Sequence, residues 1–158
     1  MRRLLLLFAM LSFGCETETA TTAVVDDRSG SVVYRVWWET TYFPTPIAPD
    51  TTSDELRSVP ATDFAYALLA PGWNAASTSA PTSFVVLKSK QPLSVARGET
   101  LHIAVSDATF TGSCDVHDPL SQADADFITQ RIFPGEFEGL RYDAGTCTMS
   151  PLADAGGD

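Results

Sequence analysis

Residues 31–43 read SVVYRVWWETTYF, and apolar side chains recur along them at every second position. The side chains that would share one face of an extended chain are Val32, Tyr34, Val36 and Trp38. Arg35 and Glu39 would lie on the opposite face, together with Val33 and Trp37. An alternation with a period of two is typical of a β-strand with one buried face. The stretch therefore predicts a strand whose second face is not cleanly polar.

The pattern recurs downstream in short runs separated by turn residues. The clearest runs are residues 63–70, 84–88 and 101–105, and weaker ones lie at 93–96, near 110 and at 142–149. Pro71-Gly72 and Arg97-Gly98 supply turns between them. Short strands joined by turns predict a mainly β fold, a single antiparallel β-sandwich-like domain.

One short helix is predicted near residues 122–132. The sequence from Ser121 to Asp124 resembles a capping box, in which the Ser side chain accepts a hydrogen bond from the first turn. Apolar side chains follow at helical spacing and would pack this helix on the sheet: Phe127, Ile128 and Ile132. The turn Pro134-Gly135 would end the helix.

The first fifteen residues, MRRLLLLFAMLSFGC, have the order of a signal peptide. Arg2 and Arg3 form a positive start, an apolar stretch follows, and the small residue Gly14 precedes Cys15. The apolar stretch is far shorter than the roughly 20 residues that a membrane-spanning helix needs. We therefore expect residues 1–14 to be a signal peptide that exports the rest of the chain.

The ending Gly14-Cys15 resembles the lipobox of bacterial lipoproteins. In that family the signal is cut just before the cysteine, which carries lipid and becomes the first residue. Ser12 and Phe13 depart from the leucine and the small residue that are usual at their positions. The resemblance covers residues 11–15 and implies a lipid on Cys15 that anchors the protein to a membrane of the bacterial cell envelope. Residues 12–14 also fit ordinary signal peptidase, which would leave Cys15 bare and the protein soluble in the periplasm or secreted.

The chain has three cysteines, Cys15, Cys114 and Cys147. If Cys15 carries lipid, the other two remain as a pair, which an oxidising compartment would join. The bridge would close a loop of about 34 residues around the predicted helix and stabilise the fold by roughly 3–4 kcal/mol. The pair is far from the close C-x-x-C spacing of redox sites, so we predict a structural disulfide.

These observations predict four segments. Residues 1–14 are the signal peptide, residues 15–30 a lipid-anchored flexible tether, residues 31–150 a mostly β globular domain, and residues 151–158 a flexible tail. Residues 16–30 are small and polar, which favours the tether. The alternative is that part of this stretch joins the sheet as an edge strand.

The charge balance is strongly acidic, with 10 basic and 20 acidic residues and a net charge of −10. Residues 1–14 hold two of the arginines and no acid, so eight basic residues remain and the net becomes −12. Proteins bind nucleic acid and anionic headgroups through clusters of Lys and Arg, and this sequence has no such cluster. We therefore predict no nucleic-acid partner, and we interpret the acidic charge as an aid to solubility.

The richest cluster of reactive side chains is residues 114–118, CDVHD. A second cysteine–histidine pair, which a zinc site usually needs, is missing, so we interpret the cluster as a polar turn and predict no metal. His102 is the other histidine, with Ser106 and Asp107 close in sequence. The sequence contains neither G-x-S-x-G nor H-E-x-x-H nor a glycine-rich phosphate loop. We predict no catalytic residue and no cofactor.

Aromatic side chains near strand ends are the remaining candidates. Trp37 and Trp38 must point to opposite faces if both lie in the strand, and Trp38 is the better candidate for the core. Trp73 follows a turn and is the side chain most expected to be exposed. Rows of exposed aromatics bind sugar rings in many β-sandwich modules, so Trp73 and Trp37 are the candidate ligand-binding residues.

Three functions remain open from the sequence. The first is an envelope lipoprotein with a non-catalytic β domain that serves as an interaction or structural module for an unidentified protein or glycan partner. The second is a small-ligand or glycan binder that uses Trp73 and Trp37. The third is a hydrolase built on His102 or His117.

Overall fold

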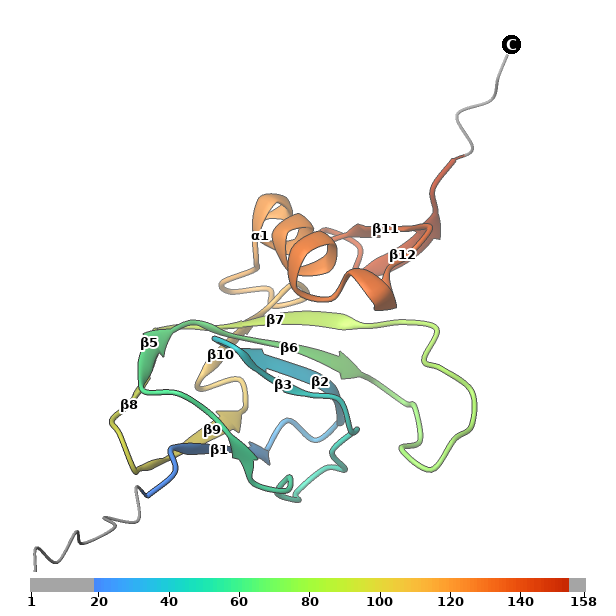
Figure 1. The fold of residues 1–158 in the computed structure, drawn as a ribbon. Helices are drawn as coiled ribbons and strands as arrows, with labels where there is room; N and C mark the ends of the chain where they lie inside the picture. Colours follow the sequence, from blue (N-terminus) through green and yellow to red (C-terminus); the bar gives the residue numbers. More distant parts are fainter. Residues whose placement is uncertain (1–18, 154–158) are drawn as a thin grey trace, which may run out of the picture.

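The structure is a computed structural model that describes residues 19–153, so Cys15 and the signal segment lie outside the described residues. The described chain forms three layers (Figure 1). A small sheet, here called sheet A, lies against one face of a five-stranded sheet, sheet B. A helix and a hairpin form a cap over the other face of sheet B. No helix within residues 19–153 combines the length and the apolar character needed to cross a membrane.

Sheet B is antiparallel, with the spatial order β10-β7-β6-β2-β3. Its strands are β2 (Val32–Trp38), β3 (Thr41–Phe43), β6 (Ala65–Ala70), β7 (Val85–Ser89) and β10 (Phe110–Gly112). The sequence predicts the three longest of them from their alternating or β-branched side chains. The prediction of a mainly β fold is confirmed.

Sheet A has the order β4-β1-β9, made of β4 (Leu56–Arg57), β1 (Thr22–Asp27) and β9 (Thr100–Val105). β1 and β9 pair in parallel, from Thr22 opposite Thr100 to Asp27 opposite Val105. This parallel pair is an exception within the predicted antiparallel sandwich, whose other strand pairs are antiparallel. Because the pair is parallel, both strands start at one end of the sandwich and finish at the other.

β1 lies inside residues 15–30, which the sequence assigns to a flexible tether. That assignment is wrong for residues 22–27, which form the central strand of sheet A rather than a link or an edge strand. Ala23 and Val25 are fully buried. The backbone of residues 51–58 runs along the second side of β1, where Ser53 N–H donates to the Val25 carbonyl at 2.8 Å. Two distant segments bury β1, so its own small and acidic side chains give little sign of a strand.

A short hairpin and the cap complete the fold. β5 (Ala61–Asp63) pairs with β8 (Leu93–Val95). The cap consists of α1 (Gln122–Phe127), the π-helical η1 (Ile128–Ile132), the 3-10 turn η2 (Pro134–Glu136) and the hairpin β11 (Leu140–Asp143) and β12 (Thr148–Pro151). Ser121 Oγ accepts from Asp124 N–H at 3.1 Å, which is the predicted cap of the helix. The fold therefore extends past residue 150, where the sequence predicts a flexible tail to begin.

Two hydrophobic cores hold the layers together, one on each face of sheet B. The first core, between the sheets, includes Trp38, Ile103 and Val105, all fully buried. The second core, under the cap, includes Phe84, Ile128 and Phe133. Coverage on both faces explains why the strands of sheet B carry apolar side chains at nearly every position.

A β-bulge in β2 changes which side chains share a face. The pairing of β2 with β6 shifts between Val33 and Arg35, which leaves Tyr34 as the extra residue. Val33 and Val36 consequently both enter the first core, while Tyr34 packs against the second. The prediction that Tyr34 shares a face with Val36 and Trp38 is wrong, because one inserted residue reverses a pattern of period two.

Besides its core, the cap is attached to sheet B by a disulfide and by side-chain contacts, which include the ion pair of Lys88 in β7 with Asp124 in α1 at 3.1 Å. The predicted Cys114–Cys147 disulfide is present and joins the residues after β10 to the loop between β11 and β12. Glu136 in η2 accepts hydrogen bonds from Arg35 Nε and from the Tyr42 hydroxyl, each at 3.1 Å. The Arg35 and Glu136 side chains are only 17% and 16% exposed, so this ion pair lies at the interface of cap and sheet.

Candidate functional site

A cleft of about 560 Å³ opens at one end of the sandwich. Val105, at the end of β9, and Ser29, just after β1, both line it. The parallel pairing of β1 and β9 brings these two strand ends together. The cleft therefore lies at the end of sheet A opposite to Thr22 and Thr100, where the two strands begin.

The floor of the cleft is apolar. It is made by side chains of four strands that also bound the first core: Leu69, Val85, Leu87, Val105 and Phe110. Gly112 lies beside them, and a Cβ at this position would stand 3.1 Å from Leu87 Cδ2 and 3.5 Å from Val85 Cγ1. A side chain at Gly112 would therefore press on Leu87, and glycine lets the backbone lie close against the floor.

The rim of the cleft is polar and includes the segment 114–118 that the sequence singles out. Asp115 Oδ1 accepts from the backbone N–H of His117 at 2.7 Å and of Asp118 at 3.3 Å. These two bonds lower the pKa of Asp115, the bond from His117 most, so the carboxylate stays ionised. The segment is a polar turn between the disulfide and the cap helix, as interpreted from the sequence.

The rest of the rim comes from the turn after β9 and the end of β7. Lys90 Nζ donates to the backbone carbonyl of Asp107 at 2.6 Å. Asp118 Oδ2 accepts from Thr111 Oγ1 at 3.5 Å. The lining thus includes three carboxylates, those of Asp107, Asp115 and Asp118, and one lysine, Lys90. No three His, Cys, Asp or Glu side chains of residues 19–153 are grouped to hold a metal ion.

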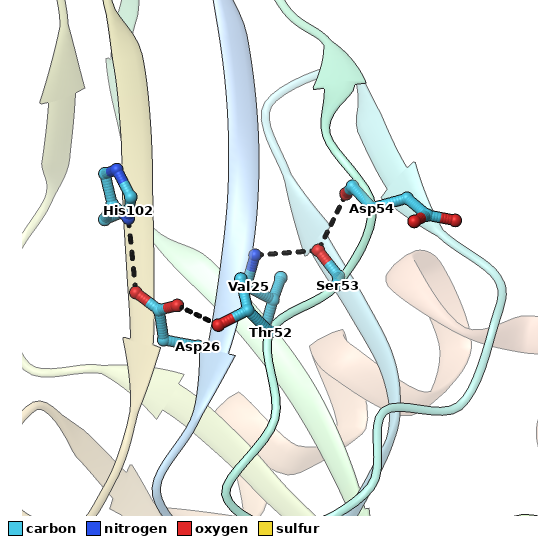
Figure 2. Close-up of polar contacts among 6 residues, drawn as sticks. All are labelled: Val25, Asp26, Thr52, Ser53, Asp54 and His102. Carbon is cyan, nitrogen blue, oxygen red and sulfur yellow. Dashed lines mark hydrogen bonds and ion pairs between the residues drawn. The ribbon is translucent and has the colours of Figure 1, made fainter.

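His102 lies away from the cleft, on the outer face of sheet A (Figure 2). Its Nδ1 stands 3.2 Å from Asp26 Oδ2, and Thr52 Oγ1 donates to Asp26 Oδ1 at 2.8 Å. The Thr52 bond is the main reason that the pKa of Asp26 is lowered, with His102 as a further cause. The structure joins His102 to an acid, but Ser106 Oγ bonds to Thr109 Oγ1 instead of joining them.

Figure 2 also shows how residues 52–54 contact β1 through side-chain hydroxyl groups. Ser53 Oγ accepts from Val25 N–H at 2.9 Å and donates to the Asp54 carbonyl at 2.8 Å. A side-chain hydroxyl therefore takes the place of a backbone partner at this point of the sheet. The hydroxyl groups around Asp26 and His102 serve the pairing of residues 51–58 with β1, and this accounts for the cluster structurally.

The two candidate tryptophans are half-buried and contact the second core. Trp73 meets Tyr34 edge to face with ring centroids 5.3 Å apart, and its indole N–H donates to the Ser79 carbonyl at 2.9 Å. Trp37 lies 6.0 Å from Tyr42. Trp38 is fully buried, as the sequence predicts. Ligand binding by Trp73 and Trp37 stays a prediction, with both rings partly covered by their neighbours.

Comparison with known protein families, with curated proteins and with solved structures gives no match to this chain. The cleft is therefore the candidate site on physical grounds alone, since it combines a concave apolar floor with a few polar groups. Sequence reasoning finds one part of it, the segment 114–118, but interprets that part as a polar turn and not as the rim of a cleft. Its floor residues have no common sequence signal, because four separate strands contribute them.

Proposed function

We propose that this protein is an exported lipoprotein of the bacterial cell envelope, attached by a lipid on Cys15, with a non-catalytic β domain that binds a partner at its cleft. The signal pattern and the ending Gly14-Cys15 support the anchor. The position of the cleft, at the end of the sandwich opposite to the start of β1, is the observation that carries the binding role.

The short distance from anchor to domain supports this arrangement. β1 begins at Thr22, seven residues after Cys15, and a chain of that length spans at most about 25 Å. The lipid would therefore hold the starting ends of β1 and β9 close to the membrane. The cleft would face away from it, beyond a six-residue strand that is roughly 17–20 Å long.

The hydrogen bonds of the polar side chains around the cleft support a site with a fixed shape, as a binding role requires. The Ser106 hydroxyl bonds to Thr109, and the Ser29 hydroxyl donates to Asp27 Oδ1 and to the Ser31 carbonyl. Asp115 holds the turn in which it lies. These hydroxyl and carboxylate groups are bonded to neighbouring groups of the rim and maintain its shape.

The test is the intact mass of the mature protein from a bacterial host, for the wild type and for Cys15→Ser. We expect the wild type to carry a diacylglycerol on Cys15 and to fractionate with membranes. The Cys15→Ser chain should lack that mass and appear in the soluble fraction. A wild type that begins at an unmodified Cys15 would contradict the anchor and identify a soluble periplasmic or secreted protein.

A further inference from the structure

We propose that the cleft binds a small amphipathic molecule with an apolar body and a cationic head. This inference rests on the proposed binding role of the domain and names the chemical class of its ligand. It uses the floor, the rim and the charge of the cleft, and none of these depends on the lipid anchor.

The size and floor of the cleft define the body of the ligand. A volume of about 560 Å³ lies within the roughly 300–1,000 Å³ typical of small-ligand pockets. Val105 and Phe110 are almost completely buried, and Leu69 and Val85 are half-buried beside them. An apolar group placed against Leu69 and Val85 would remove their remaining exposed surface from water, which is favourable by about 25 cal/mol for each Å².

The rim defines the head of the ligand. Asp107, Asp115 and Asp118 line the cleft with Lys90 as the one lysine or arginine among the lining residues, all of which are described. The ammonium of Lys90 already donates to the Asp107 carbonyl, so it is engaged at the rim. An excess of carboxylates beside an apolar floor attracts a cationic head and repels an anionic one. The net charge of −10 on the whole chain acts in the same direction.

Two probes with the same chain length test the inference by isothermal titration calorimetry below their micelle concentrations. They are decyltrimethylammonium and decanoate. The protein is the mature chain from residue 15 with Cys15→Ser, which contains all the described residues and carries no lipid. We expect decyltrimethylammonium to bind at one site and decanoate to bind at least about tenfold more weakly.

Two variants place the binding in the cleft. Val85→Phe fills the space above the floor and should weaken decyltrimethylammonium binding by about tenfold or more. Asp107→Asn removes one exposed carboxylate and should weaken it by about threefold, because exposed charges contribute little. Since Asp107 makes no side-chain bond within the described structure, this variant remains informative if Val85→Phe disturbs folding.

Matched controls lie elsewhere on the domain. Val59→Phe adds the same ring at an exposed site near the start of β1, and Glu138→Gln removes an exposed acid on the cap. Both should leave the dissociation constant within about twofold of the parent value. Affinity unchanged by Val85→Phe and Asp107→Asn would overturn the cleft as the site, and equal or tighter binding of decanoate would overturn the cationic head.

The outcomes separate this inference from the proposed function. If the mass measurement finds lipid on Cys15 but decyltrimethylammonium does not bind, the ligand class is rejected and the anchor is retained. If the mass measurement finds no lipid but decyltrimethylammonium binds in the cleft, the anchor is rejected and the ligand class is retained. An absence of saturable decyltrimethylammonium binding counts against the inference.

Discussion

At Glu136 a single carboxylate oxygen accepts from two side chains of sheet B, Arg35 and Tyr42. The guanidinium of Arg35 also lies 3.8 Å from the centre of the Tyr34 ring and donates to the Tyr34 carbonyl. Removal of the negative charge would leave a largely buried guanidinium without its counter-ion, which is costly in a site of low exposure. The two donors thus depend on one charged group of the cap.

We expect Glu136→Gln to lower the free energy of unfolding by about 2 kcal/mol in urea titrations at neutral pH. Glu138→Gln, two residues along and exposed, should leave the unfolding midpoint unchanged. Equal midpoints for the two variants would show that the ion pair contributes nothing to cap docking.

The Tyr42 phenol provides an independent readout of the same prediction. Burial first, and then the Glu136 charge, raise the pKa of Tyr42 above its ordinary value of 10.0. Its contribution to stability is therefore complete below pH 10.0 and is lost as the pH rises through the folded-state pKa. In Glu136→Gln the pKa of Tyr42 should fall toward the ordinary value, because burial alone remains to raise it. An NMR titration of the tyrosine ring signals measures this shift.

At the scale of elements, the disulfide joins the segment after β10 to the hairpin of the cap, with a sequence separation of 33. Its reduction would release loop-closure entropy to the unfolded chain, and the chain-entropy model gives a loss of roughly 3–4 kcal/mol. We expect a reductant to lower the urea midpoint of the wild type substantially. The double variant Cys114→Ser with Cys147→Ser should unfold at the reduced midpoint with or without reductant. A wild-type midpoint insensitive to reductant would contradict the prediction.

The elements that the sequence predicts are those whose burial pattern is local. β6 places Ala65 and Ala67 in the first core and Tyr66 and Leu68 against the second. The sequence of β6 alone therefore predicts a strand with alternating faces. The helix is also predicted from its own sequence, because the Ser121 cap and the spacing that buries Ile128 lie within twelve residues of each other.

β1 and the cleft could not be predicted because distant segments create them. Val24 and Val25 stand among threonines, alanines and aspartates, and the strand exists because β9 and residues 51–58 supply partners on both sides. The cleft joins strand ends that are brought together by the parallel pairing, which no local pattern indicates. The bulge at Tyr34 similarly depends on the register with β6.

At the scale of the whole molecule, the proposed lipid anchor and the parallel pairing of β1 with β9 together predict how the domain would be oriented on a membrane. Val59 follows β4, whose Arg57 pairs with Thr22, so it lies at the end of the domain that the lipid would hold. Val116 is on the rim of the cleft at the opposite end. Both side chains are exposed, by 44% and 86%, and accept a probe without disturbing a core.

We therefore expect a fluorophore on Val59→Cys of the lipidated protein in vesicles to be quenched by nitroxide-labelled headgroups, and one on Val116→Cys to be quenched much less. Two controls should abolish the difference in quenching between the two labels. Without lipid, in Cys15→Ser, neither label should be quenched. With about 15 Gly and Ser residues inserted after residue 16, the domain would tumble and the two labels should be quenched alike, because a flexible linker of that length reaches roughly 20 Å or more. Equal quenching in the uninserted protein would mean that the seven residues before β1 do not orient the domain, and the cleft would then have no fixed direction relative to the membrane.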